Sequence, residues 1–225
     1  MSSQALTEFG VVGAKLADAA IFPSRTRLRL PVATLDAVLG GGLPCGAITE
    51  IVGAMSAGRT TLARVLIGAA LQAGECAAWI DLPNAFDPDG LGSETELERM
   101  LWVCPRDRTM AVRAVEHVLD GGGFRVVVLD LDGNASERPL PAAAWLRMGR
   151  AAVRRDAAIV VLGSLHIVGP FATLSLEVRS SRRVFVGERG PSPAFVGATS
   201  ALQIRKCRFG IVTDASIELA AATQA

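Results

Sequence analysis

The sequence predicts an α/β fold, a mostly parallel sheet covered by helices with antiparallel strands at its C-terminal end. Strand-length apolar runs alternate with helical segments, and the runs at 124–131 and 157–163 are apolar almost throughout. Strands of this composition are typical of a parallel sheet that is buried on both faces. After residue 170 the pattern changes, because strand-like segments at 174–188 and 200–219 follow one another with turns rather than helices between them.

The N-terminal segment is predicted to lie outside this core. Residues 5–20 place apolar side chains at helical spacing, and Pro23 and Ser24 end the pattern before an arginine-containing stretch. We therefore expect a helix and linker over 1–29 and one core domain over 30–225. The helix either packs on its own domain or docks on a partner, and the sequence favours neither.

Within the core, helices and strands alternate. A short helix within 35–46 is closed by a run of glycines. Further helices are predicted at 62–74, 107–123 and 142–156, and the first two of these end at glycines. Strands are predicted at 47–53, 76–82, 124–131 and 157–163, and another strand follows a polar turn within 97–105. This alternation is typical of parallel strands joined by crossover helices.

Composition excludes several classes of protein. Of 225 residues, 50% are hydrophobic and 20% are charged, which is not the composition of a disordered chain. The net charge is +1, but the charges are unevenly distributed along the chain. Residues 1–149 carry 13 basic and 17 acidic side chains, whereas residues 150–225 carry 10 basic and 5 acidic side chains. Four scattered cysteines and two histidines lack zinc-binding spacing, so we assign no metal site and expect buried thiols in a reducing cytoplasm.

No membrane segment is predicted, although residues 157–176 contain no Asp, Glu, Lys or Arg. Gly163 and Ser164, and then Gly169 and Pro170, divide this stretch into pieces of strand length. Glu8 and Lys15 interrupt the apolar region that a signal peptide needs, so a cytoplasmic location is expected.

The strongest motif is the phosphate-loop pattern GAMSAGRTT, from Gly53 through Gly58 to Arg59, Thr60 and Thr61. It follows a predicted strand and opens a helix, as such loops do. In the intact motif a lysine reaches the terminal phosphates and a hydroxyl holds Mg²⁺. Arg59 keeps the charge, but its flat head does not fit the space of an ammonium group. ATP and Mg²⁺ therefore remain candidate ligands, while we favour a loop retained for its fold alone.

Asp130 ends the strand predicted at 124–131, and Asp132 follows two residues later. In a nucleoside triphosphatase a carboxylate at this place organises Mg²⁺ and water. The alternative is a strand-end carboxylate that caps a loop, and the sequence favours neither. No catalytic residue is assigned.

The segments LDAVLGGGLPCGAITEIVGAMSAGRTTLA, AAWIDLPNAFDP and VVVLDL resemble the ATPase core of RecA-type recombinases. The resemblance runs from about 30 to 215 and is most specific over 35–131. It implies a RecA-like core with the phosphate loop after the first strand of its parallel sheet. It also implies that residues needed for ATP hydrolysis are missing. Pro83 stands where working recombinases have a catalytic Glu, and Gly163-Ser164 stands where they have a polar γ-phosphate sensor.

The chain resembles the ImuA family more than it resembles the recombinases, because its core is short and GGGFRVVVLDL is followed by RPLPAAAWLRMGRAAVRRDAAIVVLG. ImuA proteins are RecA-like accessory proteins of bacterial mutagenic translesion synthesis. The resemblance implies a role in the SOS response to DNA damage, beside the polymerase-like ImuB and an error-prone DNA polymerase, with contact to RecA itself. Two alternatives stay open: an active ATPase of the recombinase or circadian-clock (KaiC) type, and a DNA-binding RecA paralogue that modulates recombination.

Basic side chains in the last third are candidates for contact with DNA or a partner. They are Arg150, Arg154 and Arg155 on one predicted helix, Arg179, Arg182 and Arg183 around a turn, and Arg205, Lys206 and Arg208 on a late strand. The resemblance places the second group near a DNA-lining loop and the third near a neighbouring subunit's nucleotide. Aromatic residues are few here, which favours contact with the DNA backbone or a protein over base stacking.

Overall fold

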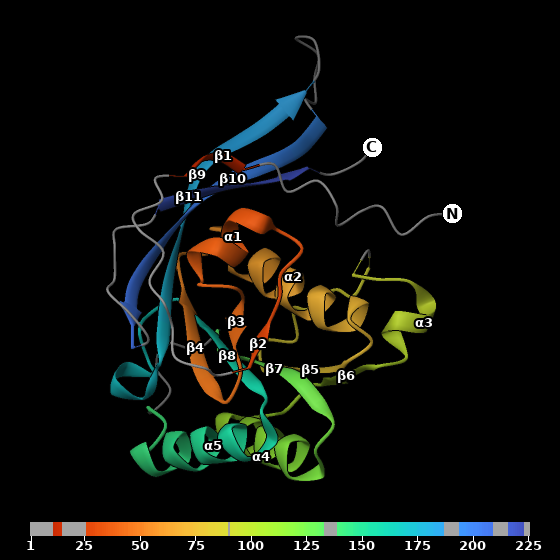
Figure 1. Ribbon diagram of the computed structural model, residues 1–225, viewed down its shortest axis with the longest axis vertical. Coiled ribbons are helices and arrows are strands. Elements are labelled where there is room, and N and C mark those ends of the chain that lie inside the picture. Colours follow the sequence, from red (N-terminus) through yellow and green to blue (C-terminus); the bar gives the residue numbers. More distant parts are fainter. Residues whose placement is uncertain are drawn as a thin grey trace.

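The computed structural model describes residues 11–14, 26–89, 91–132, 139–186, 194–208 and 216–222 (Figure 1). The described strands form one nine-stranded sheet in the order β1-β11-β10-β9-β4-β8-β7-β5-β6 and one small sheet of β2 and β3. The strands from β9 to β6 run parallel to one another, and β10, β11 and β1 each run antiparallel to their neighbours. The predicted α/β class is confirmed.

The strands have the following bounds: β1 (Val11–Ala14), β2 (Arg27–Leu28), β3 (Leu43–Pro44), β4 (Ala47–Val52), β5 (Cys76–Asp81), β6 (Met100–Val103), β7 (Phe124–Asp130), β8 (Ala158–Gly163), β9 (Leu174–Val186), β10 (Ala194–Cys207) and β11 (Ser216–Ala222). The helices are α1 (Ala33–Val38), α2 (Arg59–Gln72), α3 (Glu94–Leu97), α4 (Arg108–Gly121) and α5 (Ala142–Arg155). A 3₁₀ turn, η1, spans Gly169–Phe171.

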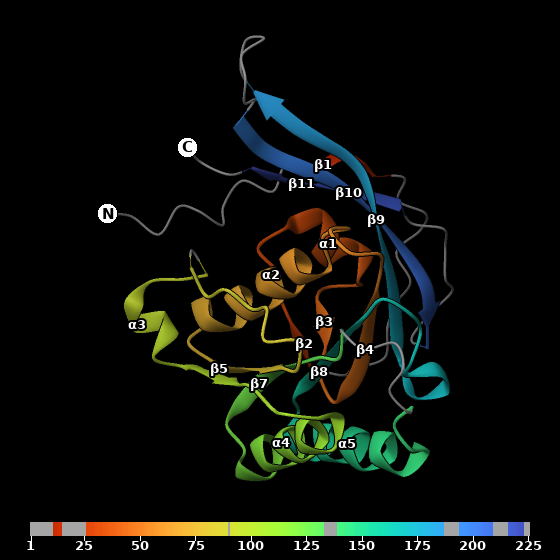
Figure 2. The ribbon, with the colours of Figure 1, turned by 180° about the vertical axis from the view of Figure 1, so that it is seen from behind.

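Helices cover both faces of the parallel strands. Figures 1 and 2 show α1 and α2 on one face and α4 and α5 side by side on the other. Two hydrophobic cores result, one containing Leu66 and Trp79 and the other containing Trp145 and Met148. β4 and β8 are buried along their whole length, as the uniformly apolar strand at 157–163 predicts.

Local sequence explains where several helices begin and end. The Asp107 carboxylate accepts a hydrogen bond of 2.8 Å from the backbone N–H of Met110, which caps the start of α4. Ser93 and Glu96 form a capping box at α3, the acidic run that precedes β6. Gly122 directly follows the last residue of α4, and its φ of +74° is a conformation that suits glycine.

The C-terminal antiparallel strands rise past α1 at one end of the molecule (Figure 1). β9 pairs with β10 along most of its length, with Val178 opposite Leu202. Arg179, Arg182 and Arg183 lie on β9, so the predicted turn at these residues is wrong. The pairing to β10 continues through the arginines, and these cross-strand partners hold the backbone extended.

Part of the predicted N-terminal helix is also wrong. Residues 11–14 form β1, which pairs antiparallel with β11 and so joins the core sheet. Backbone pairing with an available edge strand outweighs the weak helical pattern, and Val11 and Val12 suit a strand. The rest of 5–20 lies outside the described residues.

The cysteines are only partly as expected. Cys45 is buried, Cys76 and Cys207 are half-buried, and Cys104 is exposed. Cys104 is exposed and directly follows β6, the outer strand of the parallel part of the sheet. Among the described helices, none has the length and apolar character needed to span a bilayer.

Candidate functional site

The predicted phosphate loop connects β4 to α2. Gly58 adopts φ +103°, and a Cβ atom there would lie 2.7 Å from the Ser200 Oγ on β10. At Gly53 a Cβ atom would lie 2.3 Å from the backbone oxygen of Val178 on β9. Both glycines are therefore required sterically, because the loop packs directly against the two long strands. The strand–loop–helix context that the motif requires is present.

Ser200, on β10, holds the backbone of the phosphate loop in place. Its Oγ donates a 2.7 Å hydrogen bond to the carbonyl oxygen of Ala57, which is buried. Met55, at the tip of the loop, is 84% exposed. The sequence carries no local signal for Ser200, which lies 143 residues after its partner. The backbone of the loop is thus held by a strand from the C-terminal part of the chain.

Arg59 is turned inward. Its side chain is only 8% exposed, and its guanidinium forms an ion pair with Asp132, whose side chain is 28% exposed. The Nη1 atom is buried and has no hydrogen-bond partner within the described part of the chain. The cation that would reach phosphate is therefore already neutralised by a carboxylate. A phosphate group would have to displace Asp132 to take its place. Thr60 is exposed and Thr61 half-buried at the start of α2.

Asp130 acts as a capping residue in this geometry. Its Oδ1 accepts a 3.0 Å hydrogen bond from the backbone N–H of Asp132. Burial raises the pKa of Asp130 to about 6, opposed by that hydrogen bond and strengthened by the negative charges of Asp132 and Asp81. Within the described residues, no group of three or more His, Cys, Asp or Glu side chains could hold a metal ion.

The segment after β5 is organised around Asp81, which sequence reasoning missed. Asp81 is fully buried, and its carboxylate accepts hydrogen bonds from the backbone of Ala85 (3.1 Å) and Phe86 (3.0 Å) and from Trp102 Nε1 (3.1 Å). Pro83 lies in the turn that these bonds hold. Because proline has no carboxylate, Pro83 itself cannot activate water.

The raised pKa of Asp130 predicts a specific pH dependence. The folded state binds this proton more tightly than the unfolded chain, where the pKa is about 3.9. Its stabilising effect is therefore present at low pH and lost as the pH rises through about 6. We expect the stability of Asp130→Asn relative to the wild type to rise between these two pH values and to reach a gain of about 3 kcal/mol at neutral pH. Urea unfolding at several pH values measures the difference, and a difference independent of pH would contradict the assignment.

A second buried carboxylate, Glu50 on β4, was also missed by sequence reasoning. One oxygen accepts backbone hydrogen bonds from Ile167 (2.7 Å) and Val168 (2.8 Å). The other lies 2.9 Å from His166 Nδ1 and accepts a 3.1 Å bond from Ser175 Oγ. Glu50 therefore anchors the connection from β8 to β9. Ser164, at the position expected for a γ-phosphate sensor, is exposed at the start of this connection.

The predicted basic residues fall into separate groups. Arg150, Arg154 and Arg155 are exposed on α5, and the Arg155 guanidinium donates to the Asp120 carbonyl. Arg179 and Arg205 both bond to the Glu177 carboxylate, which reduces the charge that they could offer to DNA. Lys206 and Arg208 donate to the carbonyl oxygens of Gly169 and Pro170. Arg150, Arg154 and Arg208, from two of the predicted groups, line one groove.

Comparison with known proteins points to one family. The model of the RecA N-terminal domain matches residues 27–139, which is half of the chain. RecA proteins of Trichodesmium erythraeum, Synechocystis sp. and Cytophaga hutchinsonii are 39%, 38% and 40% identical to it over 100 residues. These alignments cover 43% of this chain. They span 27 to 28% of the RecA proteins, so the likeness is to a part of RecA only.

Proposed function

We propose a function for this chain, which belongs to the RecA N-terminal domain family. It is a non-catalytic RecA-like accessory protein of SOS-induced, error-prone translesion DNA synthesis. In this role it binds RecA, a Y-family-like polymerase subunit of the ImuB type, or both, and an error-prone DNA polymerase joins the assembly. DNA contact through the phosphate backbone is a secondary part of the proposal.

One observation carries the non-catalytic part. The Arg59 guanidinium is buried and paired with Asp132 in a phosphate loop that otherwise keeps its glycines and its helix. Phosphoryl transfer requires a cation that reaches the phosphates and a group that positions the attacking water. The cation is engaged with a carboxylate, and Pro83 stands where the resemblance to recombinases implies the water-positioning group. The surrounding fold is kept, which supports a role in binding rather than in chemistry.

An exposed sheet edge supports a role in protein binding. β6 is the outer strand at one end of the nine-stranded sheet that the described residues form. Leu101 and Trp102 on this strand are 39% and 43% exposed, and Met110 on α4 is 47% exposed. An outer strand with exposed apolar side chains is suited to pairing with a strand or apolar face of another protein.

The first experiment measures ATP hydrolysis with Mg²⁺ and single-stranded DNA, beside RecA from the same organism as the positive control. We expect no phosphate release above background and no difference between the wild type and Arg59→Ala. Hydrolysis that depends on DNA and is abolished by Arg59→Ala would show a working ATPase and overturn the proposal.

The second experiment measures binding of the purified chain to RecA and to the polymerase-like subunit by calorimetry. We expect binding to at least one of them, weakened about tenfold or more by the double variant Leu101→Lys with Met110→Lys, since removal of apolar contacts at an interface core has this effect. Leu165→Lys, an exposed leucine in the connection from β8 to β9, serves as the matched control. Absence of binding to both proteins would refute the accessory role.

A further inference from the structure

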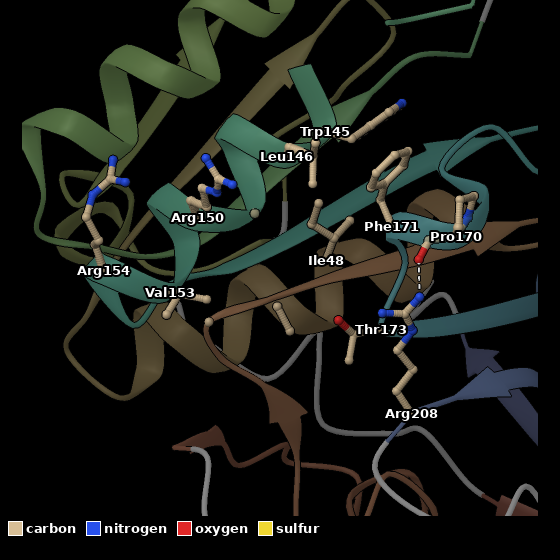
Figure 3. Close-up of a pocket in the computed structure, with 13 residues that line it drawn as sticks. Ile48, Trp145, Leu146, Arg150, Val153, Arg154, Pro170, Phe171, Thr173 and Arg208 are labelled. Atoms are coloured by element: carbon tan, nitrogen blue, oxygen red, sulfur yellow. Dashed lines mark hydrogen bonds between the residues drawn. The ribbon is translucent and has the colours of Figure 1, made fainter. Parts of the chain in front are cut away.

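A groove of about 710 Å³ lies at the start of β4, on the face of the sheet that α5 covers. Figure 3 shows Trp145, Leu146 and Val153 along α5 on one side and Phe171 on the other. The phosphate loop follows the last residue of β4, so the groove and the loop lie at opposite ends of this six-residue strand, about 20 Å apart. The groove is therefore separate from the site described above.

The floor of the groove is apolar and partly open to solvent. Leu146 is 47% exposed and Val153 is 56% exposed, although the other large apolar residues of this helix, Trp145 and Met148, are buried. Ile48 and Phe171 complete the apolar lining. Exposed apolar side chains that line a concavity are typical of a binding surface, because covering them removes apolar area from water.

The rim of the groove is positively charged, and one of its arginines, Arg154, has a carboxylate of the chain nearby. Arg150, Arg154 and Arg208 line it, and none of the lining residues is acidic. Within the described part of the chain, Arg150 makes no ion pair or hydrogen bond, and the Arg154 guanidinium lies 3.8 Å from its nearest carboxylate, Asp120. The Arg208 guanidinium donates to a carbonyl oxygen, that of Pro170. The rim therefore presents charge that a partner can complement.

The wall formed by η1 is held in place before any partner binds. Glu50 accepts the backbone N–H groups of Ile167 and Val168, immediately before η1. Lys206 Nζ donates a 2.9 Å hydrogen bond to the Gly169 carbonyl, and Arg208 donates to that of Pro170. These bonds come from β4, from β10 and from the residue that follows β10. A wall that is already ordered costs less entropy to bind against.

We propose that this groove binds an acidic amphipathic segment of a partner protein. The apolar side chains of the segment pack on Leu146 and Val153, and its Asp or Glu residues lie against Arg150, Arg154 and Arg208. Charge complementarity selects an acidic partner over a basic one. The apolar floor selects a protein over a nucleic acid, since a phosphate backbone gains nothing from leucine and valine side chains. The inference goes beyond the accessory role and holds whichever protein supplies the segment.

The test uses a phage-displayed library of random peptides of helix length, selected on the full-length chain, followed by anisotropy measurements with the enriched peptides. We expect these peptides to combine large apolar residues with Asp or Glu. Their affinity should fall about tenfold or more with Leu146→Asp, and by a similar factor with Arg150→Glu and Arg154→Glu together. Added salt should weaken binding, because the rim charges are exposed.

Matched controls lie outside the groove. Leu165→Asp changes an exposed leucine that does not line the groove, and Arg113→Glu changes an exposed arginine on α4, so both should leave peptide affinity within about twofold. Several outcomes would overturn the proposal: no peptide whose binding depends on the groove, enrichment of basic peptides, or equal binding by all variants. A labelled single-stranded oligonucleotide that loses affinity with the arginine reversals but not with Leu146→Asp would instead assign the arginines to nucleic acid. RecA binding that persists when peptide binding fails would separate this proposal from the accessory role.

Discussion

Asp132→Ala is expected to lower the free energy of unfolding by about 3 kcal/mol, because it leaves the guanidinium of Arg59 buried without its carboxylate. The Arg59 side chain is 8% exposed, and its Nη1 atom already lacks a hydrogen-bond partner among the described residues. Among the described residues Asp132 is the only ion-pair partner of Arg59. Without it, the free energy needed to keep the buried guanidinium out of water is no longer offset. Denaturant unfolding followed by the fluorescence of the three tryptophans measures the loss.

The matched control removes both charges. Arg59→Met combined with Asp132→Leu replaces the pair by apolar side chains of similar size, and we expect its stability to lie within about 1 kcal/mol of the wild type. If Asp132→Ala alone costs less than about 0.5 kcal/mol, the pair has no structural role, and Arg59 is free to serve a bound phosphate. The experiment therefore also tests the basis of the proposed non-catalytic function.

Glu50→Ala is expected to destabilise the protein by about 4 kcal/mol. Its carboxylate accepts the N–H groups of Ile167 and Val168 and the hydroxyl of Ser175, and it lies against His166 Nδ1. Each buried donor that loses its acceptor costs about 1 to 3 kcal/mol, and the shortened side chain leaves a cavity on β4. Denaturant unfolding measures the total.

The site of the loss can be located by hydrogen exchange. Because Glu50 holds the backbone just before η1, the amides of 167 and 168 should lose protection more than those of α4. Glu50→Gln, which keeps one oxygen acceptor, should cost less than Glu50→Ala. Glu98→Ala, an exposed glutamate at the end of α3, should change stability by less than about 0.5 kcal/mol. Equal losses for Glu50→Ala and Glu98→Ala would show that the buried network contributes nothing.

Both predictions concern buried charges, and sequence reasoning found only part of them. It identified Arg59 and Asp130 because each stands at a recognisable place. Arg59 follows the last glycine of the phosphate loop, and Asp130 ends a buried strand. It missed Asp81 and Glu50, although each is an acidic residue within a mostly apolar strand. That signal was available, since a carboxylate in a buried strand must be hydrogen-bonded. Its partners could not be read from the chain, because they lie in segments that meet it only in the folded sheet.

The sequence by itself determined the order of strands and helices along the core of the chain, the place of the phosphate loop, and the presence of Arg59 where the motif has a lysine. These features are local, set by apolar periodicity, glycines and residue identity over a few turns of chain. Only the tertiary structure decided that Arg59 pairs with Asp132, 73 residues away, that Ser200 supports Ala57 across 143 residues, and that residues 11–14 join the sheet. It also decided that Arg208 meets α5 at one groove. These contacts depend on which strands are neighbours in the sheet. Apolar periodicity carries no information about the order of strands in the sheet.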